Sequence, residues 1–296
     1  MNGWLILDKP LGLSSTQALG KARRLLGAKK AGHGGTLDPL ASGVLPLAFG
    51  EATKLISFVM DGRKEYRFTV RWGEARTTDD AEGDVTAVSE VRPTETAIRA
   101  ALPGFIGDIS QTPPIFSAIK VAGERAYDLA RAGEKVELAS RIVQVFDFQL
   151  ISIDDNDHAS FAVTCGKGTY VRSLARDLAL KLGTAGYVSA LRRDRSGPFT
   201  LDRAISLENL AELSHKGEAL TALLDIGAAL DDIPARVIDD REARLLRHGQ
   251  GIMPQPGEIL PNPNGTQPVL ATHHGNPVAL IAPKDGIWHP VRGFNL

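Results

Sequence analysis

The sequence predicts an α+β protein made of one large domain and one small, mostly β domain. Strand-like and helix-like stretches follow one another without the regular alternation of a doubly wound parallel sheet. The length of 296 residues leaves room for about two domains. Near residues 231–234 the chain changes to a short helix (239–248), a run rich in Gly, Pro and Asn, and short strands such as 277–282. We therefore expect a main domain over residues 1–232 and a small domain over residues 233–296.

Local patterns predict the elements of the first half in order. Ser14 and Gln17 have the spacing of a capping box, and the apolar stripe behind them predicts a helix over residues 14–27. Residues 64–73 alternate strictly between apolar and polar side chains, which is typical of a half-buried strand. A short helix is predicted over residues 94–102.

The second half continues with an insertion, two strands and a helix. A Pro-rich piece opens a protruding segment at about 110–140, in which residues 119–133 have helical character. Residues 142–153 and 159–165 indicate two strands joined by an acidic turn. A strong helix is predicted over residues 170–182, because its apolar residues share one face and a glycine follows it.

The composition excludes several classes of protein. With 43% hydrophobic and 23% charged residues, the chain has the balance of an ordinary globular protein. No apolar run approaches the roughly 18 residues of a membrane span, and the N-terminus lacks the basic segment of a secretory signal. The single cysteine, Cys165, excludes an intramolecular disulfide and a cysteine-cluster zinc site. We expect a cytoplasmic protein.

The net charge of −1 conceals an uneven distribution. Residues 1–78 hold 12 Lys and Arg against 6 Asp and Glu, and residues 165–200 hold 7 against 2. Residues 201–296 are acidic, with 8 against 12, and the acidic patch at 79–90 contains no basic residue. The two basic segments could form one polyanion-binding face, or they could be scattered surface charge.

The glycine-rich stretch 32–47 carries the most informative residue, Asp38. No other acid lies between Asp8 and Asp38, whereas six cations lie within or beside that gap. A carboxylate can act as a nucleophile without a cofactor, provided that a nearby cation keeps it ionised. The alternative is a turn aspartate before Pro39, which is a common use of Asp-Pro.

Other candidates each have two interpretations. His33 could contact a phosphate or a base, or be an ordinary loop histidine. Tyr66 and Tyr170 could bind a base or belong to the core. Residues 167–176 mix cations with an aromatic ring, as nucleic-acid-binding surfaces do. The basic run 191–195 could contact phosphates or form a solvated turn.

Tests for a serine-hydrolase elbow and for cofactor-binding motifs fail. No Gly-x-Ser-x-Gly occurs, the phosphate-loop pattern near 166–169 lacks its first glycine, and Leu37 takes the third position of a dinucleotide fingerprint. The seven histidines lack paired metal spacing, and the adjacent His273 and His274 are predicted to lie in a loop. We expect neither a cofactor nor a metal.

Seven collinear motifs within residues 1–200 resemble those of the TruB family, the bacterial tRNA pseudouridine(55) synthases. The motifs are Leu7-Asp8-Lys9-Pro10, Gly32-His33-x-Gly-Thr-Leu-Asp38-Pro39-x-Ala-x-Gly43, Gly50-Glu51-Ala52-Thr53-Lys54, Lys64-x-Tyr66, Gln111-x-Pro113-Pro114-x-x-Ser117-Ala118-x-Lys120, Gly168-Thr169-Tyr170-x-Arg172 and Leu191-Arg192-Arg193. The resemblance implies a catalytic domain with a mixed, largely antiparallel sheet, followed by a small β domain like the RNA-binding PUA module. It also implies that the segment at about 110–140 is a mobile RNA-binding insertion.

The same resemblance implies a reaction and its residues. The family isomerises a flipped-out uridine in the T-loop of tRNA, at position 55, and needs no cofactor or metal. Carried over to this chain, Asp38 is the nucleophile, which attacks either C6 of uracil or C1′ of ribose. Arg172 is the cation paired with it, and Tyr66 stacks on the target base. Tyr170 and Leu191 are pocket walls. His33 is expected to help to hold flipped nucleotides, and Lys9 is expected to be a structural or RNA-facing contact.

We expect the tRNA T-arm as the partner of a monomer that needs no obligate protein. Three alternatives remain. The first is a homologue guided by partner RNAs and proteins that acts on ribosomal RNA. The second is an RNA chaperone or RNA-binding module with a vestigial site. The third is a glycosidase, which would need a second carboxylate opposite Asp38 that no neighbouring motif supplies.

Overall fold

The computed structural model describes residues 1–117, 119–121, 124–127, 136, 138–230, 233–258, 260 and 268–296. Its strands are β1 (Gly3–Lys9), β2 (Ala31–His33), β3 (Ala41–Phe49), β4 (Lys64–Trp72), β5 (Glu74–Arg76), β6 (Val85–Val88), β7 (Gly107–Gln111), β8 (Lys120–Val121), β9 (Glu124–Arg125), β10 (Arg141–Ile153), β11 (His158–Cys165), β12 (Gly186–Ser196), β13 (Phe199–Thr200), β14 (Ala235–Val237), β15 (Val269–His273), β16 (Asn276–Lys284) and β17 (Ile287–Gly293). Its α-helices are α1 (Ser15–Leu25), α2 (Ile56–Asp61), α3 (Glu95–Ala101), α5 (Val171–Lys181), α6 (Leu207–His215) and α7 (Asp240–Arg247). The α+β class is confirmed.

The elements with clear local patterns form as predicted. The Ser14 side chain accepts from the Gln17 amide and the Gln17 side chain accepts from the Ser14 amide, so the capping box that starts α1 is complete. In β4, Phe68, Val70 and Trp72 are buried and alternate with more exposed residues. The predicted strands at 142–153 and 159–165 pair as β10 and β11.

The helix predicted over residues 119–133 is wrong where the structure describes it. Residues 120–121 and 124–125 pair as the short antiparallel strands β8 and β9, and only residues 126 and 127 are helical within 119–127. Within the predicted insertion at 110–140, residues 118, 122–123, 128–135 and 137 lie outside the described part of the chain.

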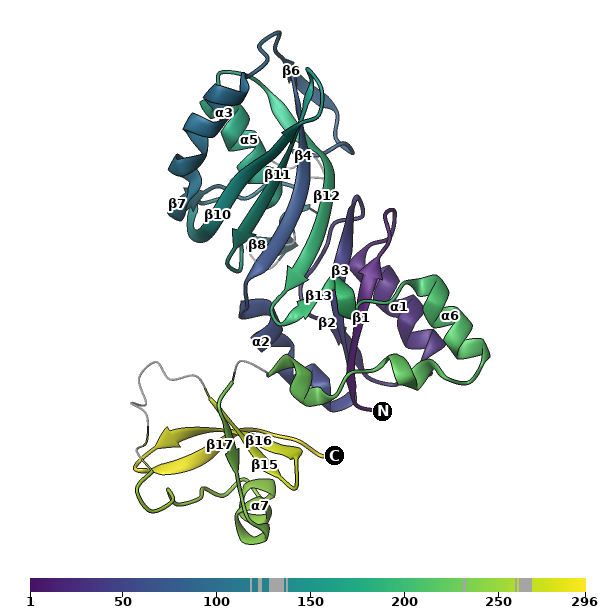
Figure 1. The fold of residues 1–296 in the computed structure, drawn as a ribbon, viewed down its shortest axis with the longest axis vertical. Coiled ribbons are helices and arrows are strands. Elements are labelled where there is room, and N and C mark those ends of the chain that lie inside the picture. The colour runs from purple at the N-terminus through teal and green to yellow at the C-terminus, as the bar shows by residue number, and fades with distance from the viewer. Residues whose placement is uncertain are drawn as a thin grey trace.

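A nine-stranded mixed sheet forms the main body, with its central strands in the order β1-β3-β12-β4-β11-β10-β7 (Figure 1). The late strand β12 lies between two early strands, parallel to β3 and antiparallel to β4. Gly43 makes the β3–β12 contact possible. Its φ is +102°, and a Cβ there would lie 2.2 Å from the Arg193 carbonyl oxygen. The pairing brings residues 41–43 beside 191–193, and thus joins the Asp38 loop to the second half of the chain.

Helices cover the sheet and bury its aromatic core. Helices α3 and α5 pack over β4, β10 and β11, around stacked Phe68 and Phe161 whose ring centroids lie 5.5 Å apart. Helices α1 and α6 pack side by side at the β1–β3 end (Figure 1). This close-packed core therefore keeps the central strands of the sheet rigid.

The C-terminal strands form a second sheet in the order β14-β15-β16-β17, as expected for a small β domain. Phe294 packs in a cluster with Trp4 of β1, and Lys54 Nζ donates to the Gly293 carbonyl oxygen at 2.8 Å. The sheet is therefore attached to the main body near the N-terminus (Figure 1). Residues 231–232 lie outside the described part of the chain, so the domain boundary stays a prediction. Among the described helices, none is long and apolar enough to cross a membrane.

Candidate active site

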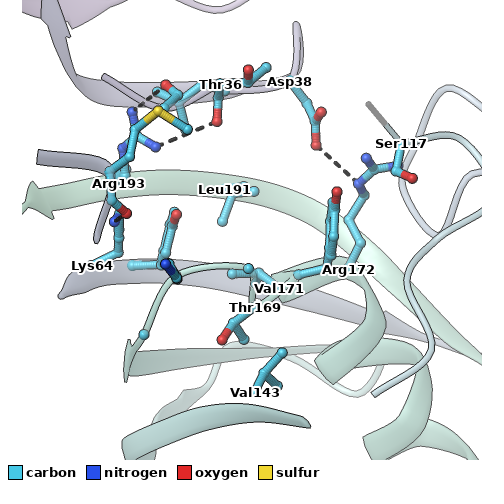
Figure 2. Close-up of a pocket in the computed structure, with 18 of the residues that line it drawn as sticks. Thr36, Asp38, Lys64, Ser117, Val143, Thr169, Val171, Arg172, Leu191 and Arg193 are labelled. Atoms are coloured by element: carbon cyan, nitrogen blue, oxygen red, sulfur yellow. Dashed lines mark hydrogen bonds and ion pairs between the residues drawn. The ribbon is translucent and has the colours of Figure 1, made fainter. Parts of the chain in front are cut away.

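A cavity of 650 Å³ opens where the Asp38 loop, β4, β12 and the start of α5 meet (Figure 2). It is lined by residues from segments far apart in the chain, namely Asp38, Lys64, Tyr66, Arg141, Lys167, Thr169, Tyr170, Arg172, Leu191 and Arg193. Five of the six predicted site residues are therefore brought together. The sixth, His33, lines a neighbouring cavity.

Asp38 lies in the loop between β2 and β3, with its carboxylate directed at Arg172 (Figure 2). Its Oδ2 lies 3.0 Å from Nε of Arg172. Burial raises the pKa of the Asp38 carboxyl above its ordinary value, and the nearby Asp80 adds to this, whereas Arg172 and Lys9 oppose the rise. The ionised carboxylate that a nucleophile requires is thus supported by one dominant cation.

Besides Asp38, two other segments hold Arg172 in place. Its side chain is 5% exposed, and it donates to the Thr78 carbonyl oxygen at 2.7 Å and to the Phe116 carbonyl oxygen at 3.0 Å. Its Nη1 also lies 3.3 Å from Oδ2 of Asp80. These contacts fix the guanidinium in place before any substrate arrives, which is the preorganisation that electrostatic catalysis needs.

Two acids of the patch at 79–90 are paired with cations in space, contrary to their appearance in the sequence. Asp80 pairs with Arg172, and Asp79 pairs with Arg176 at 2.9 Å. Burial raises the pKa of the Asp79 carboxyl, and Arg176 opposes the rise. No motif near Asp38 supplies a second carboxylate, but folding places Asp80 beside the same arginine, and the Asp80 carboxylate already accepts from Thr78 Oγ1 and the Glu82 amide. It therefore holds the arginine in place.

Two polar side chains anchor the Asp38 loop from below. Ser15 Oγ bonds both the amide and the carbonyl of Leu37, at 2.7 and 3.0 Å. Lys9 is fully buried, and its Nζ donates to the Pro39 carbonyl oxygen of the loop at 3.5 Å and to the Pro10 and Leu13 carbonyl oxygens at 2.8 and 2.6 Å. Burial lowers the pKa of Lys9 to about 8, which is opposed by Asp38. Lys9 is thus a structural residue and not an RNA-facing one.

Arg193 supports the same loop from β12. It is 1% exposed and donates through Nε to the Val44 carbonyl oxygen at 2.8 Å and through Nη2 to the Gly35 carbonyl oxygen at 3.2 Å. Figure 2 shows Leu191 projecting between this arginine and the Asp38–Arg172 pair. The run 191–195 is therefore part of strand β12, which rules out the solvated turn that was one of its two interpretations.

Tyr66, Tyr170 and Leu191 line the cavity, as the resemblance implies. Burial raises the pKa of the Tyr66 hydroxyl, so this ring is neutral at physiological pH. Gln111 fixes the backbone of Tyr170 with two hydrogen bonds. The Tyr170 amide donates to Oε1 at 2.8 Å, and Nε2 donates to the Tyr170 carbonyl oxygen at 3.1 Å. The aromatic walls are therefore held by the sheet and by the end of β7.

His33 lies on the other side of the Asp38 loop. It lines an 830 Å³ cavity that shares Asp38 and Arg172 with the first one. Burial lowers the pKa of the His33 imidazole, with Arg193 adding to the effect, and its buried Nδ1 has no hydrogen-bond partner among the described residues. The histidine thus borders the Asp38 loop but does not line the 650 Å³ cavity.

The cations of residues 167–176 do not form the mixed surface that the sequence indicates. Arg172 and Arg176 are bound to carboxylates and carbonyls, as described above. Lys167 is 69% exposed beside Asp61, and Arg141 lies with its Cζ 5.2 Å from the Tyr170 ring centroid. The rim of the cavity thus carries Lys167 and Arg141 as its basic groups nearest to solvent.

The sequence alone missed the roles of Arg193, Asp80 and Gln111. Arg193 and Gln111 occur in the motifs quoted above, but their partners lie in distant segments. Asp80 is in an acidic run that has the appearance of surface charge. The one available signal was the presence of Arg193 and Gln111 in collinear motifs.

Comparisons with known proteins agree with this geometry. Residues 23–171 match the TruB family pseudouridylate synthase N-terminal domain, and residues 172–231 match the tRNA pseudouridylate synthase B C-terminal domain. A tRNA pseudouridine synthase B of Bradyrhizobium diazoefficiens is 53% identical over 301 residues, covering 100% of this chain and 86% of that protein. One of Caulobacter vibrioides is 49% identical and covers 100% and 97%. A chain in the crystal structure of a Cbf5–Nop10–Gar1 complex has a TM-score of 0.73 at 27% identity, covering 98% of this chain and 84% of that one.

Proposed function

Because the chain belongs to the TruB family of pseudouridylate synthases, we propose that it converts a uridine of tRNA into pseudouridine, at position 55 in the T-loop. The proposal rests on one observation above all: an aspartate and a buried arginine are paired at 3.0 Å in a cavity lined by two tyrosines and a leucine.

The reaction is an isomerisation and balances without a co-reactant. The bond between N1 of uracil and C1′ of ribose breaks, the uracil turns, and C5 bonds to C1′ while the proton on C5 is lost and N1 gains one. Asp38 is the nucleophile, through attack on C6 of uracil or on C1′ of ribose, and it is regenerated in either case. Arg172 favours the ionised carboxylate that begins the reaction.

The cavity has the size and walls for a base taken out of its stack. A volume of 650 Å³ is in the range of small-molecule sites. Tyr66 would stack on the flipped uracil, and Tyr170 and Leu191 would enclose it. His33 borders the second cavity, where it can support the neighbouring nucleotides that a flipped base leaves without a stacking partner. Contacts of this kind would offset the few kcal/mol, roughly, that flipping costs.

The proposal is tested by tritium release from C5 of uracil. The pure chain is incubated with a tRNA transcript labelled at C5 of uridine, and the same measurement is made with Asp38→Asn. We expect release by the wild type, none by Asp38→Asn, and none from a transcript with cytidine at position 55. Release by Asp38→Asn at the wild-type rate would contradict the role of Asp38. Release from the position-55 variant would contradict the assignment of the target.

A partner-dependent enzyme is the second candidate, because the chain resembles a subunit of a Cbf5–Nop10–Gar1 complex. We propose instead that this chain acts as a monomer on tRNA without an obligate partner. Release from the naked transcript by the pure chain at its monomeric mass supports this. A chain that binds the transcript but releases tritium only after addition of a cell extract would favour the second candidate.

A further inference from the structure

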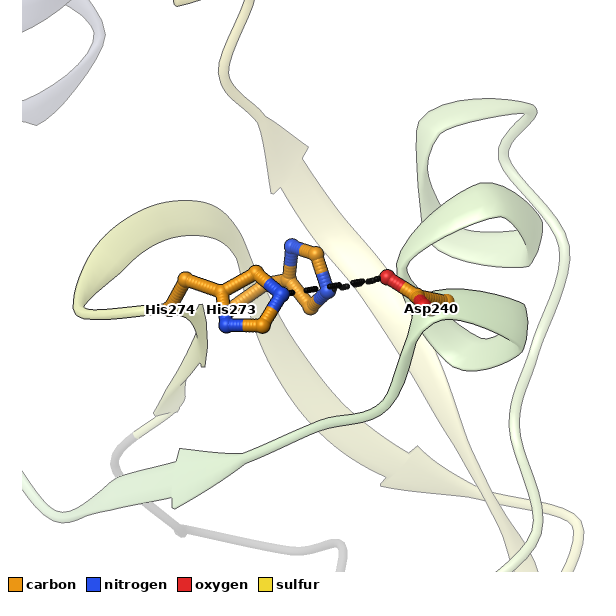
Figure 3. Close-up of side chains that lie close together, drawn as sticks. All are labelled: Asp240, His273 and His274. Carbon is orange, nitrogen blue, oxygen red and sulfur yellow. Dashed lines mark hydrogen bonds and ion pairs between the residues drawn. The ribbon is translucent and has the colours of Figure 1, made fainter.

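Outside the proposed active site, three side chains of the types that commonly bind metals lie together in the C-terminal sheet domain (Figure 3). Asp240 is the first residue of α7, His273 is the last residue of β15, and His274 begins the turn into β16. One ligand atom from each lies within 4.8 Å of the other two. The spacing test on the sequence missed this group because Asp240 lies 33 residues before His273.

The turn between β15 and β16 sets the two imidazoles side by side. His274 has φ +49° and Gly275 has φ +77°, which is the two-residue turn that usually contains Asn-Gly. A residue with a β-carbon in this left-handed conformation is uncommon, although histidine is among those enriched there. In this turn the rings of His273 and His274 have centroids 4.1 Å apart.

Hydrogen bonding to Asp240 explains the orientation of only one of the two imidazoles, that of His273. Nε2 of His273 lies 2.7 Å from Oδ1 of Asp240, which is hydrogen-bond distance. Nε2 of His274 lies 3.9 Å from the same oxygen, which is too long for a hydrogen bond, yet Figure 3 shows its ring directed at that carboxylate.

A tetrahedral metal site would explain why both imidazoles are directed at the Asp240 carboxylate. Zinc bonds to imidazole nitrogen and carboxylate oxygen are about 2.0–2.2 Å long, so ligand atoms on one zinc lie about 3.3 Å apart. The separations of 2.7 and 3.9 Å lie on either side of that value. His274 is 80% exposed and can therefore move by the fraction of an ångström required.

We propose that Asp240, His273 and His274 bind a late first-row divalent ion, with Zn²⁺ as the test ion and water as the fourth ligand. Two further carboxylates lie at the start of α7, from the N-cap residue Asp239 and from Glu242 in the first turn, and their negative charge complements the positive end of the helix dipole. The bound ion would tie the start of α7 to the β15–β16 turn. It would thereby stabilise the C-terminal sheet domain, because only the folded chain has the three ligands together.

The test is isothermal titration of ZnCl₂ into the full-length, untagged and chelator-treated protein. We expect one equivalent to bind. His274→Asn removes one ligand and keeps a residue that favours this turn, and Asp240→Asn removes another at constant size. Each should weaken binding at least roughly tenfold, since even residues outside the ligand set cost that much. The matched control is His158→Gln, because His158 and Asp155 form a pair at 2.9 Å outside this group of three.

Two readouts separate a built site from adventitious binding. Added Zn²⁺ should raise the melting temperature of the wild type and of His158→Gln but not of His274→Asn, and Co²⁺ should give the visible absorption of a tetrahedral site only in the first two. If His274→Asn and the wild type have the same melting temperature without metal, the variant is folded. The absence of stoichiometric binding, or equal binding by all variants, would overturn the proposal. No readout uses tRNA, so the result is independent of the proposed function.

Discussion

Replacing Arg193 with methionine should loosen the loop that carries Asp38 and slow the chemical step far more than it weakens tRNA binding. The guanidinium is 1% exposed and joins β12 to this loop through the Gly35 carbonyl oxygen and to β3 through the Val44 carbonyl oxygen. Methionine fills much of the same space but donates no hydrogen bond.

The size of the effect on stability follows from the hydrogen bonds of Arg193 to the Val44 and Gly35 carbonyl oxygens. A hydrogen bond that involves a charged group contributes roughly 1.5–3 kcal/mol, so the loss of two costs about 3–6 kcal/mol. The variant is spared the desolvation of a buried cation, which offsets part of that loss. We therefore expect Arg193→Met to lower the free energy of unfolding of the main domain by about 2–4 kcal/mol. A displacement of Asp38 by about 1 Å would slow single turnover by roughly 100-fold.

Urea unfolding gives the first quantity, and single-turnover tritium release at saturating protein gives the second. Arg192→Met is the matched control, because Arg192 points to the opposite face of the same strand and makes a half-exposed ion pair with Asp8 at 2.8 Å. Its loss should change stability by less than about 1 kcal/mol. If the two variants have equal stability and equal rates, Arg193 does not support the loop. Loss of tRNA affinity with an unchanged rate at saturation would likewise refute the reasoning.

Asp38→Asn should abolish tritium release yet raise the free energy of unfolding at pH 7, because folding raises the pKa of this carboxyl above its ordinary value. Since a raised carboxyl pKa costs stability only above its ordinary value of 3.8, unfolding at lower pH should show the gain vanish. The pKa of Lys9 is lowered from 10.5 to about 8, so this residue costs stability below pH 8. As the pH rises from 8 to 10.5, the free energy of unfolding of the wild type should therefore increase by up to roughly 3 kcal/mol relative to Lys9→Met. An equal change with pH in both proteins, measured by urea unfolding, would contradict this prediction. Lys167→Ala should weaken tRNA binding and reduce its salt dependence by about one ion, measured by filter binding, whereas the exposed Lys181→Ala should do neither.

Elements whose signals are local were predictable from the sequence. The capping box at Ser14 and the strict alternation in β4 depend on neighbours within a few residues, and both formed as expected. The helix predicted from residue 119 failed where β8 and β9 pair across a turn, because the pairing of two-residue strands leaves almost no periodicity in sequence.

The residues that line the cavity could be predicted from the sequence, but the buried residues that hold them in place could not. Asp38, Arg172 and the aromatic walls could be located through collinear motifs, and the structure places them in one cavity. The buried cations Lys9 and Arg193 could not be told from surface charge, because their carbonyl partners are unremarkable in sequence and, for Arg193, lie about 150 residues away. Pairing between distant segments also hid the balance of Asp79 and Asp80 by α5.

The position of β12 has a consequence for the synthesis of the chain on the ribosome. Until residues 186–196 have emerged, β3 and β4 have no strand between them, so the nascent chain exposes two unpaired strand edges. Pairing over such long separations is slow and leaves partly folded species open to aggregation. Arg172 precedes β12 in the chain, but Arg193 reaches the Gly35 carbonyl oxygen, and Leu191 lies beside Ala41, only after β12 is inserted. A nascent chain can therefore acquire its RNA-modifying site only in the last step of building the sheet.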